Sequence, residues 1–262
     1  MNKKQKYIVA NWKMNGTKSM LEEWINRIFL KAKNNSFDED SVEVILCPPA
    51  VLVDRAFLMA QTYNAQNDFY LSIGAQDVHQ KENGAYTGDV GAGTIKEAGA
   101  KFVILGHSER REYHNESNRV VNQKVNTAIN NGLIPVICIG EKELVRNSGE
   151  AKSFIEKQLL ESIPENIDIR RIVIAYEPVW SIGTGKTPTI EEIEEMVDHI
   201  KYVVAKNRKI SENNVAVLYG GSVKSDNSTE IMSLEEVDGV LVGGASLDPD
   251  DFFDIIKSSI TQ

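Results

Sequence analysis

Eight short apolar runs recur along the chain, and most of the stretches between them carry a helical pattern of apolar positions. The runs cover residues 7–11, 42–47, 71–75, 102–105, 134–139, 172–176, 215–219 and 239–242. Continuous apolar runs of this length are typical of strands that helices cover on both faces. Strands that alternate with helices pair in parallel, so the pattern predicts an α/β fold with eight parallel strands.

Three of the predicted helices have recognisable first turns. Ser19 with Glu22, and Thr189 with Glu192, have the spacing of capping boxes. Asp248-Pro249 has the form of an N-cap followed by a first-turn proline. These signals predict helix starts shortly after the first, sixth and eighth strands.

Alternating strands and helices can build an open doubly wound sheet or a closed barrel, and strand spacing alone does not separate the two. Polar candidate residues follow the carboxyl ends of at least five well-spread strands. That distribution suits a ring of loops around one mouth better than a crevice at one switch point. Because no linker, low-complexity tract or change in composition divides the chain, residues 1–262 are predicted to form one domain.

The net charge of −9 argues against a general nucleic-acid surface, which needs a basic face. A small anionic substrate remains compatible with this charge, provided that the site carries its own positive potential. The apolar stretch 7–10 is too short for the core of a signal peptide, and no run has the length of a membrane span. We therefore expect a cytoplasmic protein without a membrane partner, in which Cys47 and Cys138 are buried thiols rather than a disulfide.

Residues 175–186 combine a buried strand end, one carboxylate and a glycine-punctuated loop. Glu177 follows the apolar run directly, Pro178 stiffens the chain beyond it, and Gly183 and Gly185 permit unusual backbone angles. This order predicts a base at a strand end beneath a mobile lid. The predicted lid comprises Pro178, Val179, Trp180, Ser181, Ile182, Gly183, Thr184, Gly185 and Lys186.

Two glycine-rich stretches resemble nucleotide-binding motifs but lack residues that these motifs require. Residues 183–187 end like a P-loop, but Trp180 stands where its first glycine should be. Residues 91–96 lack a third glycine and do not directly follow a strand, so the dinucleotide fingerprint also fails. His, Asp and Glu show no convincing metal-ligand spacing, and the sequence therefore predicts neither a cofactor nor a metal.

Five further motifs, in this order along the chain, complete the pattern. They are Asn-Trp-Lys-Met-Asn-Gly at 11–16, Gly-His-Ser-Glu-Arg-Arg at 106–111, Pro-Val-Ile-Cys-Ile-Gly-Glu at 135–141, Tyr-Gly-Gly-Ser-Val at 219–223 and Leu-Val-Gly-Gly-Ala-Ser-Leu at 241–247. Together with residues 175–186, they make the chain resemble the triosephosphate isomerase family from about Val9 to about Phe253. The resemblance implies a (β/α)8 barrel, the interconversion of D-glyceraldehyde 3-phosphate and dihydroxyacetone phosphate, and a place in glycolysis and gluconeogenesis.

Proton abstraction next to a carbonyl needs a base, a donor to the developing oxyanion and a nearby positive charge. Glu177, His107 and Lys13 are the candidates for these roles, and Asn11 would orient Lys13. The resemblance implies that the glutamate moves the proton between adjacent carbons while a neutral histidine and the lysine stabilise the enediolate. Enclosure by the lid should raise the basicity of Glu177. From the residues alone, Glu177 could instead be a structural carboxylate, and Lys13 a Schiff-base or surface lysine.

The phosphate of the substrate is expected near the glycines that follow the last strands and in the lid. The candidates are Gly183, Ser222, Gly243 and Gly244, whose loops offer backbone N–H groups. The Ser222 hydroxyl could equally serve as a local cap. The expected supporting residues are Ser108, Glu109 beside Lys13, and Cys138, which packs at a strand end.

The segment 77–88 is long for a connection between a strand and a helix. In similar proteins it inserts into a second subunit, so the resemblance implies a homodimer with Met14, Gln76 and Thr87 at the interface. The chain departs from the family pattern at Ser181, where alanine is usual, and at Lys201, where arginine is common. Other phosphosugar-acting barrel enzymes and a non-catalytic barrel binding protein are the alternatives.

Overall fold

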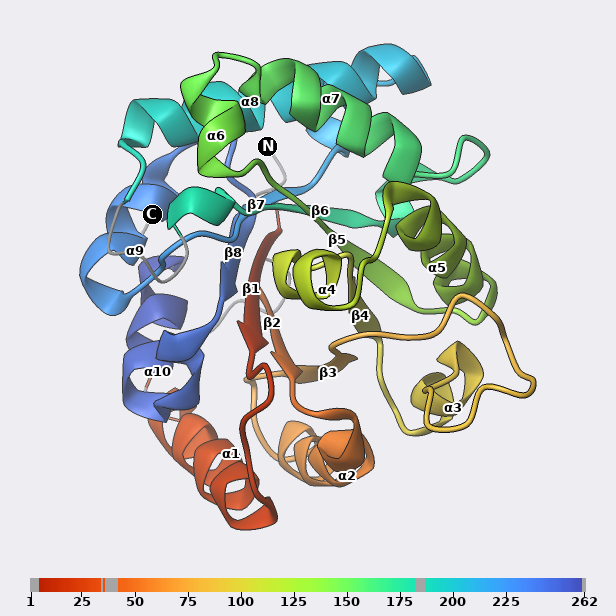
Figure 1. Ribbon diagram of the computed structural model, residues 1–262. Coiled ribbons are helices and arrows are strands. Elements are labelled where there is room, and N and C mark those ends of the chain that lie inside the picture. Colours follow the sequence, from red (N-terminus) through yellow and green to blue (C-terminus); the bar gives the residue numbers. More distant parts are fainter. Residues whose placement is uncertain (1–4, 34, 36–41, 182–186, 261–262) are drawn as a thin grey trace.

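Eight parallel strands form a closed barrel surrounded by helices in the computed structural model (Figure 1), which describes residues 5–33, 35, 42–181 and 187–260. The strands are β1 (Lys6–Asn11), β2 (Val42–Cys47), β3 (Leu71–Ala75), β4 (Phe102–Leu105), β5 (Ile134–Ile139), β6 (Val173–Tyr176), β7 (Val217–Tyr219) and β8 (Gly239–Val242). Each pairs with its sequence neighbours, and β1 closes the ring by pairing with β8. The predicted α/β barrel is confirmed.

The helices occupy the connections between the strands. They are α1 (Lys18–Ala32), α2 (Val53–Asn64), α3 (Ala92–Glu97), α4 (Ser108–Tyr113), α5 (Asn118–Asn130), α6 (Glu143–Asn147), α7 (Ala151–Ser162), α8 (Ile190–Arg208), α9 (Ser225–Ser233) and α10 (Pro249–Ser258). Short 3-10 turns are η1 (Ala50–Leu52), η2 (Ile169–Arg171), η3 (Val179–Ser181), η4 (Glu212–Asn214) and η5 (Gly244–Leu247). In the part of the chain that the structure describes, no helix is long and apolar enough to cross a membrane.

Alternation along the strands divides the apolar core into two clusters. Val9 belongs to a cluster made of strand residues, whereas its neighbours Ile8 and Ala10 belong to a larger cluster shared with the helices. Successive side chains of a strand point to opposite faces, so the first cluster fills the barrel and the second joins the barrel to its helices. Cys47 and Cys138 are free thiols within the first cluster, as predicted.

Two strands begin later than the apolar pattern predicts. Ile172 and Val215 are buried, but the backbone N–H of each closes a 3-10 turn by donating to Ile169 and Glu212 respectively. An apolar run indicates burial rather than sheet pairing. Both predicted strands therefore included buried residues that belong to the turns leading into the strands.

The predicted helix starts have mixed outcomes. Thr189 and Glu192 form the complete capping box, and the Asp248 carboxylate accepts from the backbone N–H groups of residues 250 and 251. The Ser19–Glu22 box is wrong, because Thr17 is the N-cap of α1 and its hydroxyl accepts from the Met20 N–H. A threonine two residues earlier thus accepts from the backbone N–H groups of the first helical turn, which have no partner within the helix.

Candidate active site

A pocket of about 370 Å³ opens at the carboxyl ends of the strands. Its walls come from the segments after β1, β4, β6, β7 and β8. The lining residues are Asn11, Lys13, His107, Glu177, Gly220, Gly221, Ser222, Val223, Lys224, Leu241, Gly243, Gly244, Ala245 and Asp251. The structure therefore brings together Lys13, His107 and Glu177, which lie far apart in the sequence. Lys224 and Asp251 were not among the predicted site residues.

Glu177 follows β6 directly and is only 2 % exposed. Its Oε1 lies 2.9 Å from His107 Nε2, and its Oε2 accepts a 3.1 Å hydrogen bond from the Ser108 backbone N–H. Its own N–H donates to the Ile139 carbonyl at the end of β5. Both the carboxylate and the backbone of Glu177 are thus held in place.

The pKa of Glu177 lies below its usual value. Burial raises this pKa, but the contact with His107, the Ser108 N–H and the charge of Lys13 together outweigh burial. Burial thus acts in the expected direction, but the contacts of the carboxylate outweigh it; the effect of enclosure by the lid stays a prediction, because residues 182–186 lie outside the described residues. Desolvation was foreseen, whereas the direct contact with His107 was not.

His107 is the N-cap of α4 and is buried. Its Nδ1 accepts a 3.2 Å hydrogen bond from the Glu109 backbone N–H, which leaves the proton of the neutral ring on Nε2. Burial lowers the pKa of His107, but the charge of Glu177, the hydrogen bond to it and the charge of Glu109 together outweigh burial and raise this pKa overall. The amide at Nδ1 opposes full protonation, so the geometry presents an Nε2–H toward the pocket.

Lys13 has a left-handed backbone, with φ of 52°. Its N–H donates to the Asn11 side-chain oxygen at 3.0 Å, and its Nζ lies 2.7 Å from a carboxylate oxygen of Glu109. A Cβ added at Gly243 would lie 3.2 Å from Cε of Lys13. Non-glycine residues with positive φ are costly and cluster at functional sites. The predicted contact between Lys13 and Glu109 is confirmed, and Asn11 holds the lysine backbone.

The loops after β7 and β8 form another part of the pocket wall. A Cβ at Gly221 would lie 2.1 Å from the Tyr219 hydroxyl, so this turn requires glycine. The loop after β8 is anchored by the Trp12 and Trp24 indole N–H groups, which both donate to the Ser246 carbonyl. The side chain of Asn227, rather than Ser222, completes the turn after β7, because it bonds the Lys224 N–H and the Ser222 carbonyl.

The first part of the predicted lid is described, and Ile182, Gly183, Thr184, Gly185 and Lys186 lie outside the described residues. Val179 to Ser181 form η3, and the Ser181 hydroxyl donates to the Pro178 carbonyl. The Trp180 indole N–H donates to Glu141 Oε1 at 2.9 Å.

Glu141 is a buried carboxylate to which the sequence assigned no role, although it ends the motif at 135–141. Its Oε1 accepts from the Tyr176 hydroxyl as well as from Trp180, and its carbonyl accepts from the Val179 N–H. Glu141 therefore ties the end of β5 to the segment that follows Glu177.

The remaining predicted positions lie around this centre. Cys138 is buried at the end of β5, and burial raises its pKa well above the usual value. Gln76 donates to the Cys47 carbonyl, whereas Met14 and Thr87 are exposed.

Lys201, one of the two departures from the family pattern, is buried outside the pocket. Its Nζ lies 2.7 Å from Glu236 and 3.0 Å from Asp238.

Gly140 is a second residue that sequence reasoning missed. A Cβ there would lie 1.7 Å from the carbonyl oxygen of Glu177. We expect Gly140→Ala to displace the Glu177 backbone, lower kcat by about tenfold or more and destabilise the fold by about 1–3 kcal/mol. Gly93→Ala in α3 is the matched control, since it meets only the Asn131 side-chain oxygen at 3.1 Å. Steady-state kinetics and thermal unfolding measure both effects, and wild-type kinetics for Gly140→Ala would contradict this account.

A buried carboxylate, an imidazole N–H and an ammonium group converge at the carboxyl end of a (β/α)8 barrel, in a pocket that glycine loops suited to phosphate also line. This combination defines the class of barrel enzymes that move protons on small phosphorylated substrates.

Comparison with known proteins gives the particular family. The family model described as triosephosphate isomerase matches residues 6–259. A triosephosphate isomerase from Jannaschia sp. (strain CCS1) is 44 % identical over 258 residues, covering 97 % of this chain and 98 % of the relative. One from Xanthobacter flavus is 41 % identical, covering 96 % of each chain. A solved structure of triosephosphate isomerase from Bartonella henselae is 36 % identical in sequence and has a TM-score of 0.84. The match covers 97 % of this chain and 98 % of that chain. The chain belongs to the triosephosphate isomerase family.

Proposed function

We propose that Glu177, His107 and Lys13 catalyse the family's reaction in this chain, the interconversion of D-glyceraldehyde 3-phosphate and dihydroxyacetone phosphate. The observation that carries this assignment is the 2.9 Å contact between the Glu177 carboxylate and His107 Nε2 in a pocket that Lys13 also lines. A base, a hydrogen-bond donor and a cation are the three groups that enolisation requires.

The first step is removal of a proton from the carbon next to the carbonyl. Glu177 takes this proton, the C–H electron pair becomes the carbon–carbon double bond, and the carbonyl oxygen becomes the enediolate oxygen. His107 Nε2–H and the Lys13 ammonium donate to that oxygen. A proton exchange between the two oxygens and return of the proton from Glu177 to the neighbouring carbon complete the isomerisation with no net gain or loss of atoms.

The hydrogen-bonded contact between Glu177 and His107 has a role in this cycle. The contact with His107 lowers the pKa of Glu177, and burial opposes it. When the carboxylate turns from His107 to a substrate carbon, it gives up this contact while burial remains, so its basicity rises. The same movement frees His107 Nε2–H to donate to the substrate oxygen.

The phosphate group is assigned to the loops after β7 and β8. Gly220 to Ser222 and Gly243 to Gly244 line the same pocket as the carboxylate, and backbone N–H groups in such loops bind phosphate in barrels. Gly183 of the lid belongs to the same proposal and lies outside the described residues.

A coupled assay with purified protein tests the reaction. We expect fast conversion of D-glyceraldehyde 3-phosphate to dihydroxyacetone phosphate without an added metal or cofactor. Absence of turnover in folded protein would contradict the proposal and favour another phosphosugar-acting barrel enzyme or a binding protein.

The proposal includes a cytoplasmic homodimer. Met14 is 98 % exposed beside the strained Lys13, and Val51 after β2 and Tyr86 in the loop after β3 are also exposed apolar residues. These three residues follow adjacent strands of the barrel, and apolar side chains gathered on one side are typical of a protein interface.

We expect Thr87→Glu to shift the protein from dimer to monomer and to lower kcat in proportion, because a carboxylate would have to be buried in the interface. Thr229→Glu, on an exposed position of α9 on another side of the barrel, is the control. Sedimentation velocity and kinetics at the same concentrations measure the effect. A fully active monomer would contradict the functional need for a dimer.

A further inference from the structure

Helix α4 carries two groups that contact Glu177, yet it lacks an apolar anchor. His107 is its N-cap and Ser108 its first residue, and both bond the Glu177 carboxylate. None of the six residues of α4, all of which are described, is buried. Since a helix this short is unstable by itself, tertiary contacts must hold it. With no buried apolar face, those contacts have to be polar.

Arg111 supplies one set of these contacts. Its guanidinium donates to the carbonyls of Gly106 and Cys138 at 2.7 and 3.1 Å, and to the Asn118 side chain at 2.7 Å. These bonds fix the middle of α4 against the ends of β4 and β5. None of these three bonds reaches the loop after β3, so other contacts must hold α4 on that side.

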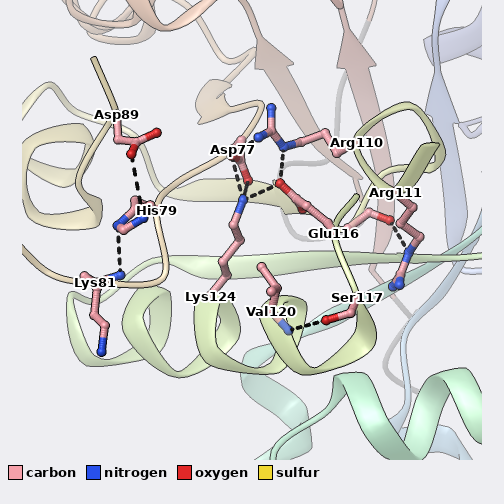
Figure 2. A network of polar contacts seen from close by, with 11 residues as sticks. Asp77, His79, Lys81, Asp89, Arg110, Arg111, Glu116, Ser117, Val120 and Lys124 are labelled. Carbon is pink, nitrogen blue, oxygen red and sulfur yellow. Dashed lines mark hydrogen bonds and ion pairs between the residues drawn. The ribbon is translucent and has the colours of Figure 1, made fainter. Parts of the chain in front are cut away.

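Four charged residues hold that side, and we name Asp77, Arg110, Glu116 and Lys124 the charge cluster (Figure 2). Arg110 on α4 reaches Asp77 at 2.9 Å through Nη2 and Glu116 at 2.6 Å through Nε. Lys124 on α5 bonds both Asp77 oxygens at 2.7 and 2.8 Å, and Glu116 Oε1 at 2.6 Å. The side chains of Lys124 and Glu116 are 4 % and 5 % exposed.

The charge cluster is balanced and connects three segments. Two cations face two carboxylates, so the buried charges of Lys124 and Glu116 and the partly buried charges of Arg110 and Asp77 compensate one another. Asp77 lies near the start of the loop after β3, Arg110 belongs to α4, Glu116 lies in the connection between α4 and α5, and Lys124 lies in the middle of α5. Short charge-assisted bonds of this kind are geometrically demanding, and a forked guanidinium fixes direction as well as distance.

We propose that the charge cluster positions the amino-terminal end of α4, and with it the Nε2–H of His107 and the N–H of Ser108, against Glu177. Arg110 and Lys124 are then positioning residues that act through α4 without touching the substrate. Through Asp77 the cluster also links the loop after β3 to His107. The inference rests on the proposed role of His107 in the reaction.

Arg110→Lys is the most direct test, because it keeps every charge and removes only the forked guanidinium that contacts both Asp77 and Glu116. We expect kcat to fall about tenfold with KM within about twofold, since small misplacements of catalytic groups are costly. The imidazole ¹⁵N signals of His107, one of four histidines, should shift as the bond from the Glu109 N–H loosens. Arg27→Lys is the matched control: Arg27 makes a similar two-pronged contact with Asp250 on the surface, and its loss should leave kcat and the His107 signals unchanged.

The double variant Lys124→Met with Glu116→Gln provides a second test, because it removes one cation and one anion and keeps the cluster neutral. The same fall in kcat and shift of the His107 signals are expected. Lower melting temperatures with wild-type kcat and unshifted His107 signals in both folded variants would overturn the inference and leave the cluster a purely structural feature. The ¹⁵N signals do not depend on turnover, so a wild-type protein without isomerase activity would refute the proposed function separately.

Discussion

Glu177→Gln is expected to lower kcat by about 10²–10⁴-fold, the usual contribution of a general base. The amide has nearly the same shape as the carboxylate and can still accept from the Ser108 N–H, so the fold should survive. It cannot take a proton from carbon at neutral pH. Exchange of the substrate C–H proton with solvent, followed by NMR, should fall in parallel with kcat.

Glu194→Gln is the matched control, because this glutamate is exposed on α8. It should retain wild-type kcat and KM. Residual activity of Glu177→Gln within threefold of wild type, in a preparation free of deamidated protein, would show that another group removes the proton.

Lys13→Met is expected to lower kcat/KM by about 10²–10³-fold, as removal of one charge-stabilising donor typically does. The methionine keeps much of the stem that passes over Gly243, but it removes the charge near the pocket. Glu109 would lose its 2.7 Å partner as well, so an unbalanced carboxylate would further weaken binding of an anion. Steady-state kinetics and the inhibition constant of inorganic phosphate measure the two parts of the effect.

Lys18→Met, an exposed lysine at the start of α1, is the control for Lys13→Met and should leave both constants unchanged. Treatment of wild-type protein with substrate and borohydride separates charge stabilisation from Schiff-base chemistry. A reduced adduct on Lys13 would contradict the electrostatic role.

The barrel was predictable because its signal is periodic and local. Eight apolar runs gave the eight strands. β6 and β7 begin later than predicted, because the N–H groups of Ile172 and Val215 close 3-10 turns, and β1 begins one residue earlier than predicted, at Lys6. Thr17 replaced Ser19 as a helix cap because several residues near a helix start can accept from the same N–H groups. Local sequence patterns locate helices and strands well, but they do not decide which of several neighbouring residues is the helix cap or the first residue of a strand.

The candidate site was predictable where it follows strand ends. Lys13, His107 and Glu177 were named from motifs, and the barrel brings them to one pocket. Their electrostatics were not predictable, since the lowered pKa of Glu177 depends on a contact between residues 70 positions apart. The role of Glu141 and the contact of Arg110 with Asp77 have no local pattern, because they arise only when the end of β5 meets β6 and when α4 meets the loop after β3.

The closure of the barrel affects how copies of the chain can associate. Each strand, including β1 and β8, bonds two neighbours, so the sheet offers no free edge onto which a strand from another molecule could add. Self-association by edge-to-edge strand addition, a common route to fibres, is therefore blocked by topology rather than by charged or proline-bearing edge residues. Any specific pairing of subunits must use side chains and loops, so a substitution such as the proposed Thr87→Glu can test pairing without altering the backbone bonds of the barrel.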